Sequence, residues 1–535
     1  MEEADMEDAF SVDAAPTIAS ERSVFVNARR RNVPPAQRED YGDGIPGNAT
    51  VFVHTFGCGH NVSDGEYMAG LLAQTGYRIT DVFNDADVYL LNSCTVKNPS
   101  EEHFISMMNR VRALGKPLVV AGCVPQADPK NTQWDDVSVI GVRSIDRVAQ
   151  VIHEALQGHC VRLIGASEYT IKTQETNELP PLDLPKIRRN RFIEIIPISV
   201  GCLNHCTYCK TKQARGDLRS WPITSIILRV RSILREGIKE IRLTSEDVGA
   251  YGIDINTDLV CLLRAIVKEL EGTDVMLRVG MSNPPYLLRQ LDDFAALLKH
   301  PNLYEFMHIP IQSGSNRVLE AMQREYSVEE FYECVHRIRG VVPNVTLATD
   351  IICAFPGEGE EEWRDTMNVC AQVRFPVLNI TRFYPRRNTP AAAMKQIPTE
   401  VAKRRTTELT EFFNSYRTFD HMIGEVHTVA LLETAHDKHH LVGHTKAYVQ
   451  VLVDPQEGRL GETVTVVITS TTKYSVRGRV LRSRLEWLLA KVTKTVHNLN
   501  WKSLTVFASV ASASVAVTSI AMYKAALTRR QRGGV

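Results

Sequence analysis

Three closely spaced cysteines that follow an apolar run constrain this chain more than any other feature. Cys202, Cys206 and Cys209, called the cysteine loop below, have C-x₃-C-x₂-C spacing, and the run 192–200 before them predicts a strand. Three thiolates on one loop can bind three irons of a [4Fe–4S] cluster, because cysteine thiolates are the usual ligands of such clusters. A fourth cysteine at ferredoxin-like spacing does not follow, so one iron would stay open to the amino and carboxylate groups of S-adenosylmethionine (SAM). A structural zinc site is the alternative, although such sites normally close with four ligands in two pairs.

The composition narrows the class of protein. The 535 residues provide room for about two to four domains. The formal net charge is zero, so RNA binding would have to depend on local basic patches. The eleven cysteines are an odd number and widely spread, and the acidic N-terminal residues do not form the apolar segment of a signal peptide. These features favour a reducing environment facing the cytosol over a secreted disulfide framework.

Residues 503–523 carry no charged side chain and are long enough for one helical bilayer crossing. Lys502 precedes the segment, and Lys524 and Arg529 follow it, which gives it basic flanks. As the last element it predicts a transmembrane tail anchor in the endoplasmic reticulum membrane, with the other domains facing the cytosol. The mitochondrial outer membrane is the alternative location. Because the segment is rich in alanine and serine, a buried or interfacial helix is the other interpretation.

Residues 1–47 predict disorder, because they are polar and lack a periodic apolar pattern. From Thr50 onwards strands alternate with helices, which predicts a parallel sheet with both faces covered. Strands are expected at 51–56, 88–91 and 116–121, with a helix at 64–74. The polar, proline-containing segment 165–185 predicts a linker.

A longer α/β region follows the linker. Its strands are expected near 192–200, 239–244, 275–279, 305–311, 346–353 and 377–383. Six such units suit a partial (β/α)6 barrel, in which the carboxyl ends of the strands carry the chemistry, and the cysteine loop follows the first strand. Short alternating strands from 425 to 468 then predict a small β-barrel, a fold that commonly binds oligonucleotides. A barrel that serves only for packing is the alternative.

Three further cysteines follow apolar strands of the first α/β region. Cys58, Cys94 and Cys123, called the N-terminal cysteine site below, are each flanked by small residues. Loops at the ends of parallel strands meet at one edge of the sheet, so they could bring three thiolates to a second iron–sulfur cluster with one open iron. Three unrelated buried cysteines are the alternative. The other five cysteines lack this context and are interpreted as core residues.

Two three-cysteine sites, an α/β barrel and a C-terminal β-barrel, in this order, resemble the radical-SAM methylthiotransferases. The motifs at 202–216 (CLNHCTYCKTKQARG), 243–252 (LTSEDVGAYG) and 281–286 (MSNPPY) are similar to the archaeal and eukaryotic members that act on N6-threonylcarbamoyladenosine (t6A) in tRNA. Members that act on isopentenyladenosine or on a ribosomal protein usually lack the Lys-Thr-Lys that follows Cys209. Asn388 departs from the family pattern, because relatives often have glycine there. The difference leaves the cluster ligands unchanged and affects only the conformation of a loop.

The resemblance implies an α/β fold class with a parallel-sheet methylthiotransferase domain, a partial (β/α)6 radical-SAM barrel, a small TRAM β-barrel and a C-terminal transmembrane helix. The predicted boundaries are 1–47 for the disordered segment, 48–164 for the methylthiotransferase domain, 165–185 for the linker, 186–420 for the radical-SAM domain, 421–483 for the TRAM domain and 503–523 for the anchor.

The resemblance also implies a reaction, the methylthiolation of t6A at position 37 of tRNA to 2-methylthio-t6A with two [4Fe–4S] clusters. One SAM would methylate a sulfur at the N-terminal cysteine site, and a second SAM at the cysteine loop would yield the radical that abstracts the C2 hydrogen. That hydrogen is unactivated, so acid–base catalysis alone cannot readily replace it with sulfur. The alternatives are another modified adenosine or a ribosomal protein as substrate, and a membrane-tethered regulator without activity.

Further cofactor-binding residues follow from the resemblance. The backbone near Tyr208 would contact the adenine of SAM, Glu246 would position SAM, and Arg278 would hold its carboxylate. For Glu246 and Arg278 a salt bridge within the barrel is the alternative. Asp350 and Glu358, at a strand end and in the following loop, are further candidates.

RNA contacts are expected from the small β-barrel and from nearby basic residues, with the anticodon loop as the partner, because RNA recognition favours unpaired bases. Two basic groups are candidates, namely Lys210, Lys212 and Arg215 beside the cysteine loop, and Lys186, Arg188, Arg189 and Arg191 after the linker. Solvated surface charge is the alternative for both groups. The sequence leaves the electron donor and the sulfur source open.

Overall fold

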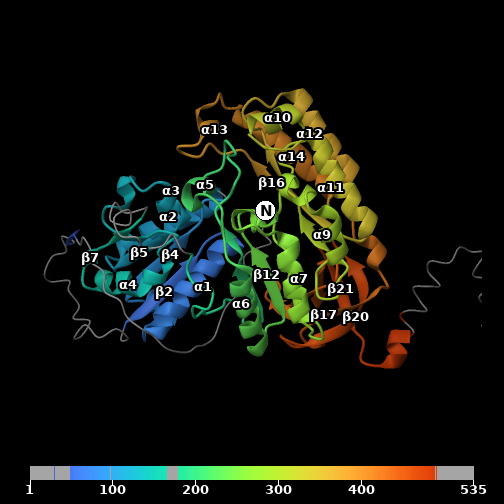
Figure 1. Cartoon of the computed structure of the whole chain (residues 1–535), viewed down its shortest axis with the longest axis horizontal. Helices are drawn as coiled ribbons and strands as arrows, with labels where there is room; N and C mark the ends of the chain where they lie inside the picture. Colours follow the sequence, from blue (N-terminus) through green and yellow to red (C-terminus); the bar gives the residue numbers. More distant parts are fainter. Residues whose placement is uncertain (1–28, 31–48, 97, 165–178, 489, 491–535) are drawn as a thin grey trace, which may run out of the picture.

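The computed structural model describes residues 29–30, 49–96, 98–164, 179–488 and 490. Figure 1 shows an N-terminal domain, a larger central barrel and a small C-terminal barrel that pack against one another. Of the predicted disordered segment only β1 (Arg29–Arg30) is described, and it pairs with β7 (His159–Cys160). Within the described ranges no helix is long and apolar enough to cross a membrane. The predicted anchor at 503–523 lies outside the described residues.

The N-terminal domain is built on a six-stranded parallel sheet with strand order β3-β2-β4-β5-β6-β8. The strands are β2 (Thr50–Thr55), β3 (Arg78–Thr80), β4 (Val88–Ser93), β5 (Leu118–Gly122), β6 (Ser138–Ile140) and β8 (Arg162–Leu163). Side chains of α1 (Gly59–Gln74) and α4 (Val148–Leu156) complete the apolar core on one face, and those of α2 (Asn98–Ala113) complete the core on the other. Every residue of β4 and β5 is therefore buried. The predicted parallel sheet with covered faces is confirmed.

Helix α1 begins at Gly59, directly after Cys58, whereas the sequence predicted a helix from residue 64. The first turn of α1 is polar in sequence and nevertheless buried. Asn61, for example, donates a hydrogen bond from Nδ2 to the carbonyl oxygen of Phe56 at 2.7 Å. Because these polar side chains bond to neighbouring loops, the helix extends to the N-terminal cysteine site.

The central barrel consists of two three-stranded parallel sheets, with strand orders β13-β12-β9 and β14-β15-β16. The strands are β9 (Ile193–Pro197), β12 (Glu240–Thr244), β13 (Met276–Arg278), β14 (Phe306–His308), β15 (Thr346–Cys353) and β16 (Val377–Arg382). A parallel bridge between Met281 and His308 joins the two sheets. The main outer helices are α6 (Ile223–Arg235), α7 (Leu259–Leu270), α9 (Leu291–Leu298), α11 (Val328–Val341), α12 (Glu360–Val373) and α14 (Thr399–Asn414). Six parallel strands thus form the wall of the central barrel, and Figure 1 shows α11, α12 and α14 on its outside.

The strands of the central barrel have an apolar outer side and a polar inner side. Leu277 and Ile351 are fully buried in the large core between strands and helices. Their neighbours Arg278 and Asp350, and His308 on β14, point the opposite way, because successive side chains of a strand alternate. These three side chains stay partly exposed. The interior of the barrel therefore offers polar groups that solvent can reach.

The C-terminal domain is a closed barrel with strand order β17-β18-β19-β21-β20. Its strands are β17 (Val426–Thr434), β18 (Leu441–His444), β19 (Gln450–Val453), β20 (Thr463–Thr471) and β21 (Ser475–Val480). The predicted small barrel is confirmed, although β18 and β21 were not predicted. The amide of Glu305, just before β14, donates to the carbonyl oxygen of Lys446 at 2.7 Å, and Arg242 pairs with Glu433 at 2.7 Å. The small barrel thereby covers the amino ends of the central strands, the end opposite the cysteine loop.

The described part of the predicted linker packs between the first two domains. Leu182 is buried in the core of the central barrel, and the hydroxyl of Tyr67 on α1 donates to its carbonyl oxygen at 3.0 Å. Gly70 lies against the backbone of Pro185 so closely that a Cβ there would be 2.2 Å from the carbonyl oxygen. The two domains therefore meet through tight backbone contacts at this segment.

The basic residues after the linker belong to this domain interface. Lys186 is only 1% exposed, and its Nζ lies 3.5 Å from Glu66 and 3.2 Å from Glu194. Arg188 also pairs with Glu194, and a guanidinium nitrogen of Arg189 donates to the carbonyl oxygen of Thr55 at 2.5 Å. The prediction that this group contacts RNA is wrong for these three residues, because buried carboxylates hold Lys186 and Arg188, and a carbonyl oxygen holds Arg189, at the domain interface. Arg191, by contrast, is exposed.

Candidate functional site

The cysteine loop lies between β10 (Ser199–Val200) and α5 (Thr211–Arg215). Backbone hydrogen bonds shape it, from Cys202 N to Gly216 O at 3.1 Å and from Cys209 N to Cys206 O at 3.0 Å. All three thiols are partly buried. Burial raises the pKa of Cys202 to about 12, with the nearby Asp247 carboxylate adding to the shift, and burial also raises the pKa of Cys209. These thiols become thiolate ligands only if a positive centre such as iron compensates.

Arg324 contacts the cysteine loop and was not predicted. It follows α10 (Asn316–Ala321), and its Nη1 lies 3.2 Å from Cys206 Sγ and 3.4 Å from the Tyr208 hydroxyl. Its other terminal nitrogen donates to Asn283 Oδ1. No motif marked this arginine in the sequence, whereas Asn283 lies in the MSNPPY motif. Arg324 thus joins the loop to the residues after β13.

Asn283 in turn holds a buried carboxylate. Its Nδ2 donates to Asp247 Oδ2 at 2.7 Å. Burial raises the pKa of Asp247 to about 6, although the hydrogen bonds from Asn283 and the charge of Arg324 oppose the shift. Cys206, Arg324, Asn283 and Asp247 therefore form one chain of contacts beneath the loop. Tyr208 packs beside it, with its ring centre 6.3 Å from that of Phe355.

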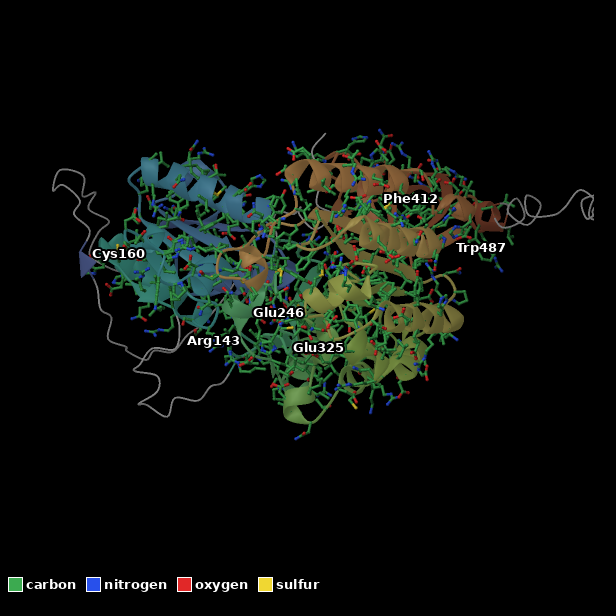
Figure 2. All side chains as sticks on the ribbon, turned by 90° about the horizontal axis from the view of Figure 1, so that it is seen from above. Arg143, Cys160, Glu246, Glu325, Phe412 and Trp487 are labelled. Atoms are coloured by element: carbon green, nitrogen blue, oxygen red, sulfur yellow. The ribbon has the colours of Figure 1, made fainter. Side chains whose placement is uncertain are left out.

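A surface cavity of about 690 Å³ opens beside the same loop. His205 of the loop lines it, together with Arg324 and Glu325. Figure 2 labels Glu325 on the barrel side of the molecule. Solvent therefore approaches the cysteine loop from this side.

The three cysteines of the N-terminal site converge at the carboxyl edge of the N-terminal sheet. Cys58 precedes α1, Cys94 follows β4, and Cys123 begins α3 (Cys123–Ala127) directly after β5. The sulfur atoms of Cys58 and Cys94 lie 3.9 Å apart. Burial raises the pKa of Cys123 to about 12, although the charge of Arg215 opposes the shift.

Glycines make room for this convergence. Gly57 has a φ of +82°, and a Cβ on it would lie 2.3 Å from the Cys94 Cβ. Gly122 has a φ of +91°, and a Cβ there would lie 2.3 Å from the Ser93 carbonyl oxygen. Only glycine fits both the conformation and the space at these positions.

Among the described residues, no group of three or more His, Cys, Asp or Glu side chains is arranged to hold a metal ion.

Arg215 links the two cysteine sites and is buried, not a surface contact for RNA as predicted. Its Nε lies 3.3 Å from Cys123 Sγ and 3.6 Å from Glu246 Oε1, and its Nη2 lies 2.7 Å from Asp64 Oδ2. The side chain is 1% exposed. The prediction is wrong because two acidic side chains and a thiol enclose the guanidinium group.

Glu246 lies on the same bridge. Its Oε1 is 2.9 Å from His60 Nδ1, and its Oε2 accepts a hydrogen bond from the amide of Gly201 at 2.8 Å. Burial alone would raise the pKa of Glu246, but His60 and Arg215 outweigh it and lower this pKa. Figure 2 shows Glu246 at the junction of the N-terminal domain and the barrel. Glu246, predicted to position SAM, thus ties the residue before Cys202 to the N-terminal domain.

The two lysines predicted beside Arg215 also have partners within the chain. Lys210 Nζ donates to the carbonyl oxygens of Ala127 at 3.2 Å and Arg387 at 2.9 Å. Lys212 Nζ lies 2.7 Å from Asp217. Both lysines are therefore bonded to other parts of the chain beside the cysteine loop.

Asn388, where relatives often have glycine, has a φ of 64°. This is the left-handed region, in which asparagine is the most tolerated residue after glycine. Its carbonyl oxygen accepts a hydrogen bond from Gln213 Nε2 at 2.5 Å. The departure from the family pattern thus keeps a left-handed loop conformation that glycine favours.

Arg278 is not brought together with the cysteine loop. Its guanidinium carbon lies 4.9 Å from the ring centres of Phe306 and of Tyr448 in the small barrel, towards the amino ends of the strands. Asp350 pairs with His308, its Oδ2 lying 2.9 Å from His308 Nε2. Glu358 is buried against Arg405 at 2.8 Å, and burial raises its pKa to about 7.

The described domains match three family models. Residues 50–141 match the uncharacterized protein family UPF0004, residues 196–370 the radical SAM superfamily and residues 420–481 the TRAM domain. The fold and the site thus define a radical-SAM protein with a TRAM domain, and the radical-SAM match supports an iron–sulfur and SAM cofactor.

Curated relatives narrow this class. The chain is 48% identical over 466 residues to the threonylcarbamoyladenosine tRNA methylthiotransferase of Danio rerio, covering 86% of this chain and 84% of the relative. It is 50% identical over 443 residues to that of Drosophila melanogaster, covering 83% and 80%. It is 46% identical over 466 residues to that of Homo sapiens, covering 86% of this chain and 79% of the relative. The chain belongs to the threonylcarbamoyladenosine tRNA methylthiotransferase family.

Proposed function

We propose that this chain is a radical-SAM enzyme that converts t6A at position 37 of tRNA to 2-methylthio-t6A. The observation that carries the proposal is the buried bridge of Arg215 and Glu246, which ties the N-terminal cysteine site to the residue before the cysteine loop. A reaction that needs both a radical source and a sulfur source requires such a fixed relation between two sites. The names of the relatives support t6A in tRNA as the substrate.

We assign one [4Fe–4S] cluster to each cysteine site. Cys202, Cys206 and Cys209 would hold the cluster that binds SAM, and the N-terminal cysteine site would hold the other. When bound, these groups supply a carbon-centred radical and sulfur, which acid–base groups cannot provide for an unactivated C–H bond. The raised pKa values of Cys123 and Cys202 are consistent with ligands that lose their protons on binding iron.

Other residues of the chain fix the positions of the two cysteine sites. Arg324 holds Cys206 and Tyr208 in place, and Arg215 with Glu246 fixes the two sites relative to each other. The small barrel closes the amino end of the central barrel. Substrate therefore has to enter at the carboxyl ends of the strands, where the cysteine loop lies.

The location in the cell is a second, separate part of the proposal. We propose that 503–523 anchors the chain in the endoplasmic reticulum membrane with its catalytic domains in the cytosol; the mitochondrial outer membrane is the alternative. The uncharged stretch and its basic flanks support an anchor. Imaging of the full chain and of a version ending at residue 500 tests this, because only the full chain should co-localise with a membrane marker.

The test of the activity is a rescue experiment. Cells that lack the protein receive the wild type, Cys202→Ala or the matched control Cys261→Ala, which removes an exposed cysteine on α7. Mass spectrometry of digested tRNA should find 2-methylthio-t6A with the wild type and Cys261→Ala and not with Cys202→Ala. If the nucleoside persists in cells without the protein and without a redundant enzyme, the substrate is another modified adenosine or a ribosomal protein.

Iron content tests the cofactor assignment. Two clusters correspond to about eight irons per chain and one cluster to about four. Anaerobically reconstituted wild type and Cys261→Ala should bind about eight irons, whereas Cys123→Ala should lose about half. If Cys123→Ala keeps the iron content of the wild type, the N-terminal cysteine site does not hold a cluster.

A further inference from the structure

Arg278 is an arginine of the barrel interior without a carboxylate of its own. It lies in register with Arg242 of the neighbouring strand β12. Arg242 is paired with two acids, Glu240 at 2.6 Å and Glu433 at 2.7 Å. Among the described residues, no Asp or Glu side chain forms an ion pair with Arg278, and its Nε is buried without a hydrogen-bond partner. The guanidinium group is half-buried, and a charged hydrogen bond is stronger than a neutral one, so this position suits an anion.

Aromatic rings are the neighbours of the Arg278 guanidinium group. The rings of Phe306 and Tyr448 lie against the guanidinium group, each 4.9 Å from its carbon. Aromatic rings stabilise a guanidinium group through its face and leave its in-plane N–H groups free. Those N–H groups match a carboxylate in two-point geometry. The site therefore suits a planar carboxylate better than a single hydrogen-bond acceptor.

The position of Arg278 favours substrate over SAM as the source of that carboxylate. Its guanidinium group contacts Tyr448, which belongs to the small barrel at the amino ends of the strands. The cysteine loop lies at the carboxyl ends, and SAM bound there would have its own carboxylate on the cluster. A second carboxylate must therefore come from a molecule that reaches down into the barrel.

The substrate carries such a group. In t6A the threonylcarbamoyl substituent on N6 ends in a carboxylate, and the carbon that bears N6 is separated from C2 by one ring nitrogen, N1. We propose that Arg278 binds this carboxylate and is the residue by which the enzyme distinguishes t6A from unmodified adenosine; this inference rests on the proposed function. An adenine with C2 at the cysteine loop would then direct its N6 substituent towards the base of the barrel.

Other polar groups lie on the inner side of strands β14, β15 and β16. His308 Nε2 lies 2.9 Å from Asp350 Oδ2, and Asn379 Nδ2 donates to Asp350 Oδ1 at 2.8 Å. His308 and Asp350 remain 20% and 27% exposed inside the barrel. They offer a donor and an acceptor for the hydroxyl and carbamoyl groups that precede the carboxylate. The inner wall of the barrel is thus polar beyond Arg278 as well.

The test compares two synthetic anticodon stem-loops, one with t6A and one with unmodified adenosine at position 37. Their affinities are measured for the reconstituted wild type, Arg278→Gln, Arg278→Lys and Arg110→Gln. Arg110 is the matched control, because it also lies over an aromatic ring, that of Phe83, but on the surface of the N-terminal domain. The wild type and Arg110→Gln should prefer the t6A stem-loop by about tenfold or more, as a charged hydrogen bond would give.

Arg278→Gln should lose this preference and keep the affinity for the unmodified stem-loop, which also shows that it is folded. Arg278→Lys, which keeps the charge, should retain part of the preference. A stem-loop whose threonyl carboxylate is esterified should bind the wild type only as tightly as the unmodified one. This last comparison needs no variant.

Two results would overturn the inference while leaving the proposed function intact. The first is an unchanged preference in Arg278→Gln or an undiminished affinity for the ester. The second is a loss of 5′-deoxyadenosine formation by Arg278→Gln with dithionite and without RNA, because that would assign the residue to SAM. A wild type that forms no 2-methylthio-t6A from the t6A stem-loop would overturn the proposed function and this inference together.

Discussion

Replacing Glu194 by glutamine should destabilise the junction of the first two domains. Glu194 on β9 is fully buried, and its Oε1 lies 3.2 Å from Lys186 Nζ and 2.9 Å from Arg229. Arg188 contacts its other oxygen. The neutral amide of Glu194→Gln would leave these three cations without their shared carboxylate.

The pKa of Glu194 gives the magnitude. Burial alone would raise this pKa, but Lys186, Arg229 and Arg188 outweigh burial and lower it from 4.5 to about 2. Each pKa unit corresponds to about 1.4 kcal/mol, so the ionised carboxylate stabilises the folded state by about 3 kcal/mol. This agrees in size with the loss of about 3–5 kcal/mol that follows when one partner of a buried ion pair is removed.

The sign of the pH dependence follows from the lowered pKa. The stabilisation is fully present above pH 4.5 and is lost as the pH falls towards about 2. The difference in stability between the wild type and Glu194→Gln should therefore be constant near neutral pH. It should narrow progressively below pH 4.5.

The assay is pulse proteolysis in urea at neutral pH, with Glu269→Gln as the control. Glu269 is an acid on α7 whose partner, Arg231, is 57% exposed, so its loss should leave the urea midpoint unchanged. With a slope of about 3 kcal/mol per M urea, Glu194→Gln should lower the midpoint of the first transition by about 1 M. Equal midpoints for the two variants would refute the view that the buried carboxylate stabilises the domain junction.

Two other substitutions test the contacts between the domains. Gly70→Ala should destabilise the folded state by about 1–3 kcal/mol, because its Cβ would lie 2.2 Å from the backbone of Pro185. The control Gly340→Ala, at a helical glycine with nothing within 4 Å, should stabilise it by about 0.5–1 kcal/mol. Urea midpoints measure both changes, and shifts of the same sign would contradict the packing argument. Arg215→Met should leave Asp64 and Glu246 buried without their cation and cost about 3–5 kcal/mol, with faster amide hydrogen exchange of the Gly201 region. Arg215→Lys should recover most of the protection, and equal exchange in Arg215→Met and the wild type would refute the bridge.

The alternation of strands and helices was enough to predict the three folded regions. The strands of the central barrel begin and end within a few residues of their predicted positions, because continuous apolar runs identify buried parallel strands well. The start of α1 was missed because its first turn is polar, and only the folded structure supplies the partners that let such residues be buried. Strands β18 and β21 were missed because they are short and are interrupted by Gly443 and Gly478.

The candidate site was predictable where local spacing carries the signal. The cysteine loop and the three strand-end cysteines were found from the order of residues alone. The burial of Arg215 and Lys186 was not predicted, because the sequence does not show whether a basic side chain contacts water or a carboxylate that is distant in sequence. Asp64 is 151 positions from Arg215, and Glu66 is 120 positions before Lys186. Arg324 was missed for the same reason, since nothing near it in sequence indicates the thiol that it contacts.

The closure of the central barrel by the small C-terminal barrel has a consequence for how the protein is made. Arg242 in the middle of β12 has Glu433 of the small barrel as its second partner, beside Glu240, and Tyr448 reaches Glu240 and Arg278 from the same domain. Domains fold in order as the chain leaves the ribosome, so these interior groups lack their partners from the small barrel until nearly the whole chain has been synthesised. Completion of the barrel interior is thus a late step of biogenesis, and a chain interrupted before the small barrel would present an unfinished interior to the chaperones of the cell.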